Sequence, residues 1–272
     1  MLLPPGVFAS GNALEEFVSR DPSLRDELVV YRGEITLKGL EGLADRRNEQ
    51  AALNSIRVRL ARSFVDRLWR LCPWLRLAAI SGSAAYGRSN PSDDIDFFFV
   101  TREDRLWVTL TIAMLLAKFQ RMKDRSLPTY CFNRVMDEVE CAKAFGTSRE
   151  PLFAREALSL RVLRGQPYYR SLLQSARWMS DFFPALYRAA DLVDGAWSEG
   201  GRFRATWRGS IADWIAFACL ASYSSILGLW RNATLRESGK QDSMFRTIIR
   251  RGLFAYESRK YDLLQASYRR AF

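Results

Sequence analysis

Two short apolar runs, separated by a turn-rich stretch, constrain the fold of this chain more than any other feature. LRLAAIS (75–81) is long enough for one buried strand and stops at Gly82-Ser83. DIDFFFV (94–100) predicts a second strand, aromatic and apolar, with carboxylates only at its start. The stretch AAYGRSNPSD between them is typical of a turn. The chain therefore holds at least part of a sheet.

Helical periodicity surrounds these two strands. Apolar spacing predicts helices over 11–28, 47–72 and 104–122, and TYCFNRVM (129–136) reads as a third strand. From about residue 149 helical patterns dominate, over 151–163, 168–190, 207–236 and 241–270. We therefore expect an α+β chain with an N-terminal helical extension (1–46), a small unit of strands and helices (47–145) and a C-terminal helical region (146–272).

The composition excludes several kinds of chemistry. The chain has no histidine, which removes Ser-His-Asp and Cys-His nucleophilic sites, His-bearing zinc sites and His acid–base chemistry. Its four cysteines show no C-x-x-C spacing, so we expect thiols in a reducing, cytoplasmic setting. The first residues lack the basic segment of a secretory signal.

The charge is strongly positive and uneven. The net charge is +11, and residues 201–272 carry 13 basic and 5 acidic side chains. Such a region suits a polyanionic partner such as nucleic acid. It is equally typical of a solvated helix surface on which arginine stems cover apolar area.

One segment has the length of a membrane span. Residues 211–230 contain a single charge, Asp213, but also three serines and several small residues. We expect the core helix of a bundle and no stable membrane insertion, and a peripheral membrane contact through this segment stays open.

The chemistry of the chain is concentrated around the turn between the two apolar strands. Gly82 has no Cβ and lets the backbone approach a phosphate, and Ser83 adds a hydroxyl donor. Asp94 and Asp96 stand at i and i+2, so a strand points both to one face. Two adjacent carboxylates repel each other unless a cation neutralises them, and oxygen ligands favour a hard cation, Mg²⁺ or Mn²⁺. The alternative is a surface hairpin with capping aspartates, and Asp93 is expected to serve the turn.

The stretch SGSAAYGRSNPSDDIDFFFV resembles the signature of the DNA polymerase β-type nucleotidyltransferase superfamily. The residues that match are Gly82, Ser83, Ala85, Gly87, Ser92, Asp94 and Asp96. Tyr86 departs from the pattern, because arginine is common there, and Arg88 lies just beyond. The resemblance covers about residues 70–145 and implies a small mixed sheet with flanking helices at 47–145, followed by a helical acceptor-binding region.

The resemblance also implies an activity: transfer of a nucleoside monophosphate from a nucleoside triphosphate (NTP) to a hydroxyl-bearing acceptor, with release of pyrophosphate. Asp94 and Asp96 would hold the catalytic metals, and Gly82 and Ser83 the phosphates. Arg88 either neutralises the triphosphate or is an exposed loop arginine. The acceptor could be a small molecule, an RNA end or a protein.

The superfamily usually has a third carboxylate on a later strand. Alternation along 129–136 places Cys131, Asn133, Val135 and Asp137 on one face, so Asp137 is the predicted third acid and Asn133 a nucleotide contact. The alternative function is a catalytically silent nucleotide- or RNA-binding protein on the same fold.

Overall fold

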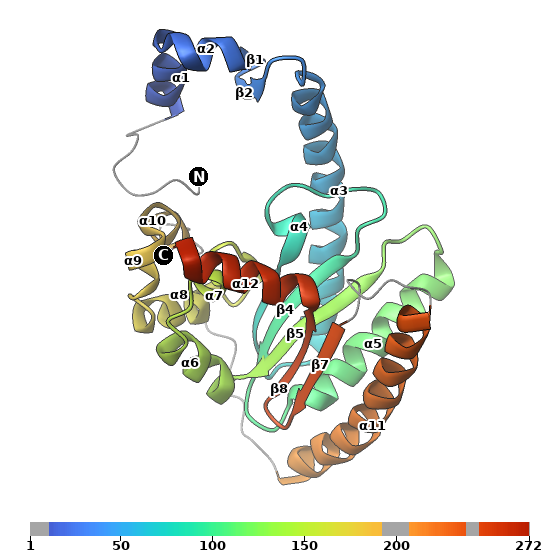
Figure 1. Ribbon diagram of the computed structural model, residues 1–272. Coiled ribbons are helices and arrows are strands. Elements are labelled where there is room, and N and C mark those ends of the chain that lie inside the picture. Colours follow the sequence, from blue (N-terminus) through green and yellow to red (C-terminus); the bar gives the residue numbers. More distant parts are fainter. Residues whose placement is uncertain (1–10, 192–206, 238–244, 272) are drawn as a thin grey trace.

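The described residues of the computed structural model, 11–191, 207–237 and 245–271, form a mixed six-stranded sheet at the centre of the molecule (Figure 1). Its order is β6-β3-β4-β5-β8-β7, with β4 and β5 parallel and the other neighbours antiparallel. The strands are β3 (Leu75–Ile80), β4 (Ile95–Thr101), β5 (Tyr130–Asp137), β6 (Arg161–Arg164), β7 (Phe245–Arg250) and β8 (Leu253–Ser258). The predicted α+β class is confirmed.

Helices cover both faces of this sheet. One face packs on α3 (Gly42–Leu71), α5 (Leu106–Lys123) and α11 (Trp207–Glu237). The other packs on α6 (Glu138–Thr147), α7 (Pro151–Leu158), α8 (Gln166–Ser175), α9 (Met179–Phe182), α10 (Pro184–Asp191) and α12 (Arg259–Ala271). Two apolar cores result, one on each side.

Strand β4 shows how the alternation divides these cores. Ile95, Phe97 and Phe99 are fully buried on the side of α3 and α5, whereas Phe98 and Val100 belong to the opposite core. The same alternation places Asp96 on the face that α7 and α12 cover.

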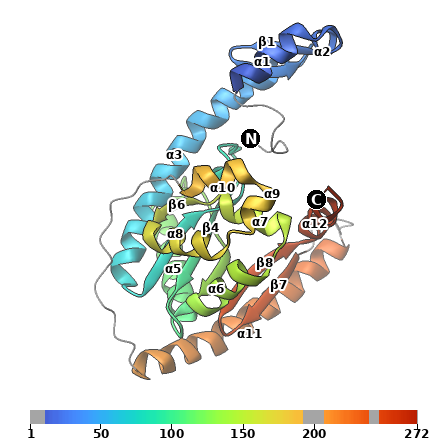
Figure 2. The same ribbon diagram turned by 90° about the vertical axis from the view of Figure 1, so that its left-hand side faces the viewer.

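The N-terminal part stands away from the sheet at the far end of α3, as Figures 1 and 2 show. It comprises α1 (Gly11–Arg20), α2 (Pro22–Glu27) and an antiparallel hairpin of β1 (Leu28–Tyr31) and β2 (Glu34–Leu37). The prediction of a purely helical extension over 1–46 is therefore wrong for its last part. Ion pairs Arg32–Asp45 and Arg47–Glu34 fasten the hairpin to α3.

The C-terminal region is not purely helical either. The predicted helix 151–163 ends at Leu158 and gives way to β6, and the predicted helix 241–270 begins instead with the hairpin β7–β8. The apolar residues of this hairpin satisfy a helical period, but its β-branched and aromatic residues on both sides of Arg251-Gly252 favour strands. Residues 201–206 and 238–244 of the basic region lie outside the described residues.

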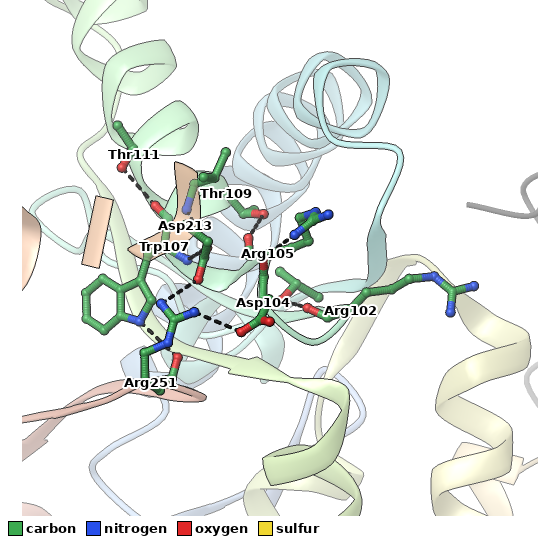
Figure 3. A network of polar contacts seen from close by, with 10 residues as sticks. Arg102, Asp104, Arg105, Trp107, Thr109, Thr111, Asp213 and Arg251 are labelled. Atoms are coloured by element: carbon green, nitrogen blue, oxygen red, sulfur yellow. Dashed lines mark hydrogen bonds and ion pairs between the residues drawn. The ribbon is translucent and has the colours of Figure 1, made fainter. Parts of the chain in front are cut away.

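A buried carboxylate joins α11 to this hairpin and to α5 (Figure 3). Asp213 accepts hydrogen bonds from the backbone N–H groups of Trp107 (2.7 Å) and Val108 (2.9 Å) in the first turn of α5. Its other oxygen pairs with Arg251 at 2.9 Å, and Arg251 also contacts Asp104 at 2.8 Å. The carboxylate thus accepts hydrogen bonds from N–H groups that have no partner within α5, and it neutralises the charge of Arg251 in the β7–β8 turn.

Within the described part of the chain, one side of α11 meets the sheet and α5. Ala216, Phe217 and Leu220 pack against the core, whereas Trp214 and Ile215 are exposed. The expectation of a core helix therefore holds for one face alone. No helix among the described residues combines the length and the apolar character needed to cross a membrane.

We predict that Asp213→Asn lowers the free energy of unfolding by about 3 kcal/mol, because it leaves Arg251 and the α5 terminus without their buried anion. The matched control is Asp104→Asn, which removes the half-exposed partner of the same arginine. It should cost no more than about 1 kcal/mol. Urea unfolding of both variants measures the difference, and equal small losses would contradict a structural role for Asp213.

Candidate functional site

The two predicted carboxylates stand at the start of β4, and Asp96 lies on the sheet face that bears Phe98. Asp94 precedes the strand and is exposed, and Asp96 is mostly buried. The neighbouring residues Ile95 and Phe97 are fully buried in the opposite face and hold the strand in this orientation. The strand alternation fixes the face of Asp96, and the charge of Asp94, one residue before the strand, acts on it.

Gly82 lies directly against the carboxylate of Asp96. Its φ is +63°, and a Cβ built on it would sit 2.3 Å from Asp96 Oδ2. The backbone N–H of Ser81 also donates to the carbonyl oxygen of Asp96 at 2.9 Å. Both the left-handed conformation and the close approach require glycine here. The structure thus brings the Gly-Ser turn and Asp96 together.

Ser83 has a partner within the loop. Its hydroxyl donates to Asp93 Oδ2 at 3.0 Å, and the same oxygen accepts from the backbone N–H of Asn90 at 2.9 Å. Asp93 therefore serves the turn, as expected. The Ser83 hydroxyl oxygen keeps acceptor capacity, but it would have to leave Asp93 in order to donate to a phosphate.

Helix α3 fixes the loop that carries these residues. Asn54 accepts from the Ser89 hydroxyl at 2.9 Å, and Arg57 donates to the carbonyl oxygen of Pro91 at 3.0 Å. Both α3 side chains are buried, so the loop is anchored by polar contacts that water cannot readily replace. Arg88 lies in the same loop with its side chain exposed.

The surroundings of Asp96 are short of positive charge. Burial raises the pKa of Asp96 to about 6, and the negative charges of Asp94, Asp93 and Glu156 act in the same direction. A hydrogen bond with Cys131 on the neighbouring strand works against this rise in pKa. A cation bound here would relieve both the repulsion and the cost of burial.

Glu156 on α7 is a carboxylate that sequence reasoning missed. It accepts a hydrogen bond from the Tyr86 hydroxyl at 3.1 Å, and the guanidinium of Arg155 lies 4.8 Å from the centroid of the Tyr86 ring. Nothing in the helical sequence PLFAREAL distinguishes this glutamate, because only the packing of α7 over the sheet brings it to Asp96.

A cavity of about 150 Å³ extends from Gly82 along the sheet face. Its walls are largely apolar and aromatic, and its polar groups come from β5, α7, β8 and α12. The lining residues are Ser81, Gly82, Phe98, Asn133, Arg134, Phe153, Glu156, Ala157, Leu160, Tyr256, Glu257 and Tyr261. Arg134 pairs with Glu257 at 3.5 Å within this wall. Asn133 thus lines the cavity, and its contact with a nucleotide stays a prediction.

Asp137 does not line this cavity. The register of β5 against β4 pairs Asp96 with Cys131 and Phe98 with Arg134, so three residues of β5 oppose two of β4. This bulge changes the register within β5, and Asp137 pairs with Thr101, about 17 Å along the strand from Asp96.

The side chain of Asp137 has a structural role at that end. It accepts from the backbone N–H of Glu140 at 2.8 Å, which caps α6, and it packs against Gly252 in the β7–β8 turn. The prediction of Asp137 as the third catalytic carboxylate is therefore wrong, because Asp137 lies at the far end of β5 from Asp96 and its carboxylate caps α6.

The donor set fits a hard divalent cation that takes part of its coordination from a substrate. Asp94 and Asp96 supply carboxylate oxygens at the start of β4, and no group of three His, Cys, Asp or Glu side chains in the described part of the chain is arranged to hold a metal. Mg²⁺ commonly binds through one or two carboxylates together with substrate phosphates and water.

Comparisons of the chain with protein-family models, with curated proteins and with solved structures gave no match.

We predict that Asp96→Asn stabilises the metal-free protein by up to about 3 kcal/mol at neutral pH. The folded-state pKa of about 6 lies above the unfolded value, so the wild type loses stability as pH rises from about 4 to about 6. The gain from the substitution should vanish below about pH 4, where the Asp96 carboxyl is neutral in both the folded and the unfolded state. Urea unfolding at both ends of this range measures it, and a variant less stable than the wild type at neutral pH would contradict the prediction.

A second prediction concerns Gly82. Gly82→Ala and Gly87→Ala both place a side chain at positive φ, which costs roughly 1–2 kcal/mol. Only Gly82→Ala also pushes a methyl group into the Asp96 carboxylate; the nearest atom at Gly87 is Asn54 Nδ2 at 3.9 Å. Gly82→Ala should therefore be the more destabilising of the two and should shift the Asp96 titration measured by NMR. An unshifted titration would rule out the close contact.

Proposed function

We propose that the protein is a nucleotidyltransferase that moves a nucleoside monophosphate from an NTP to a hydroxyl-bearing acceptor. The observation that carries this proposal is the Asp96 carboxylate held against Gly82, in excess negative charge, where a cavity opens on the sheet. A Gly-Ser turn followed by two carboxylates at the start of the next strand is the pattern on which the resemblance to the polymerase β-type superfamily rests.

Asp94 and Asp96 would hold Mg²⁺. When bound, the metal would neutralise the phosphates and lower the pKa of an acceptor hydroxyl. In the proposed reaction the acceptor oxygen forms a bond to the α-phosphorus, the bond from that phosphorus to the pyrophosphate oxygen breaks, and the hydroxyl proton leaves to a carboxylate. Gly82 would let the phosphates approach the backbone.

Glu156 is our candidate for the third carboxylate, in place of Asp137. Its charge acts on Asp96, and its side chain lines the cavity that would receive the acceptor. The Tyr86 hydroxyl fixes one of its oxygens, which leaves the other to accept a proton or ligate a cation. Tyr86 would then orient this acid, a role for the residue that departs from the superfamily pattern.

The cavity favours a small acceptor group. Its volume of about 150 Å³ admits a small hydroxylated molecule or the end of a larger one. The basic C-terminal quarter gives less support to a polyanionic acceptor than its charge suggests. Arg251 is occupied by Asp213 and Asp104, and Arg246 pairs with Glu257.

The test is transfer of label from NTPs carrying a labelled α-phosphate, each supplied with Mg²⁺ and a cell extract as the source of acceptor. Asp96→Asn should lower the transfer rate by roughly 10³-fold or more, and Glu156→Gln by about 10²–10⁴-fold. Asp137→Asn is the matched control: it alters a buried carboxylate outside the site, so transfer per folded molecule should stay within about threefold of the wild type.

Nucleotide binding separates this proposal from the alternative. Equilibrium dialysis of each NTP with Mg²⁺ that shows binding to the wild type, without transfer to any fraction of the extract, would favour a silent nucleotide-binding protein. Unchanged transfer by Asp96→Asn would remove the proposed site altogether.

A further inference from the structure

The described outward side of α11, over residues 211–226, lacks charge. Over residues 211–226 the sequence contains one charged residue, Asp213, and the structure turns it inward, with an exposed fraction of 0%. The large exposed side chains are apolar or aromatic: Trp214, Ile215 and Ile226 are 58%, 61% and 68% exposed, and Tyr223 is exposed as well. The exposed polar residues Ser222 and Ser225 are small and uncharged. This stretch thus lacks the charged outer side that a surface helix normally has.

Such a distribution is not what a water-facing helix carries. A surface helix normally buries its apolar stripe and presents charges to solvent, and a helix that is apolar all round is covered on every side. Helix α11 is apolar on both sides, but among the described residues only the side with Phe217 and Leu220 packs on the core. The other side has the composition of a covered surface.

Helix α5 packs along α11 (Figure 1), and it too carries exposed apolar side chains. Leu115, Phe119 and Met122 on its outward side are 62%, 55% and 72% exposed. We call these three residues together with Ile211, Trp214, Ile215, Tyr223 and Ile226 the apolar face.

Cations border this face at the end of α5. Lys118, Arg121, Lys123 and Arg125 are all exposed, and one acidic residue, Asp124, stands among them. The ammonium of Lys123 lies 4.5 Å from the centroid of the Phe119 ring, so positive charge and apolar surface are in direct contact.

We propose that the apolar face docks on the surface of an anionic lipid membrane, independently of the function proposed above. Aliphatic side chains would enter the boundary between headgroups and acyl chains, Trp214 and Tyr223 would lie at headgroup level, and the cations of α5 would meet lipid phosphates. Charge complementarity favours this occupant over a second copy of the chain, because two copies that each carry +11 repel one another.

Docking in this orientation leaves the candidate site open. Helices α5 and α11 cover the sheet face opposite to the one on which Asp96 and Phe98 lie. The site and its cavity would therefore point away from the lipid surface.

The experiment is flotation of the purified full-length protein with vesicles of phosphatidylcholine alone or of phosphatidylcholine with phosphatidylglycerol. We expect the wild type to float with the anionic vesicles and less so at higher salt. The double variant Ile215→Ser/Ile226→Ser should bind at least about tenfold more weakly. The double variant Lys118→Gln/Arg121→Gln should lose most of the preference for anionic lipid.

Leu263→Ser is the matched control, since Leu263 is 63% exposed on α12, outside the apolar face. It should bind vesicles like the wild type, and urea unfolding confirms that every variant is folded. The proposal is overturned if the wild type does not float with anionic vesicles, or if the isoleucine variant floats equally well. A concentration-dependent dimer in light scattering that the isoleucine variant abolishes, without vesicle binding, would assign the face to self-association instead.

Discussion

The buried carboxylate of Asp213 decides how the C-terminal part of the chain meets the sheet. Burial of an isolated charge is costly, so this side chain has to lie where the N–H groups of α5 and the guanidinium of Arg251 can meet it. That requirement sets the rotation of α11 about its axis and docks the turn between β7 and β8. It also engages Arg251, which sequence charge alone would offer to a polyanion.

A second constraint lies in the register of β5. One additional residue between Cys131 and Arg134 changes this register against β4. Cys131 remains beside Asp96, and Arg134 reaches the cavity wall. Asp137 lies at the far end of the strand, where it caps α6. The bulge therefore separates the part of β5 that serves the site from the part that serves the fold.

The local chemistry of the site could be predicted from the sequence because it rests on neighbours in the chain. The Gly82 turn and the i, i+2 spacing of Asp94 and Asp96 are short-range features that place both carboxylates at the start of one strand. Glu156 comes to the site through the packing of α7, which no local pattern encodes. The misassigned hairpin at 245–258 has the same cause: its apolar spacing fits two periods, and pairing with β5 selects the strand.

Asp96 and Asp213 illustrate what distinguishes a functional acid from a structural one. Burial raises the pKa of both carboxyls, so the direction of the shift does not separate them. Their partners do. Asp213 is surrounded by two backbone donors and an arginine, which stabilise its charge. The carboxyl of Asp96 has a hydrogen bond with the Cys131 thiol, and three other carboxylates repel its charge. A fold that keeps this repulsion gives up stability in the metal-free state, and it regains that stability only when a cation or a proton enters the site.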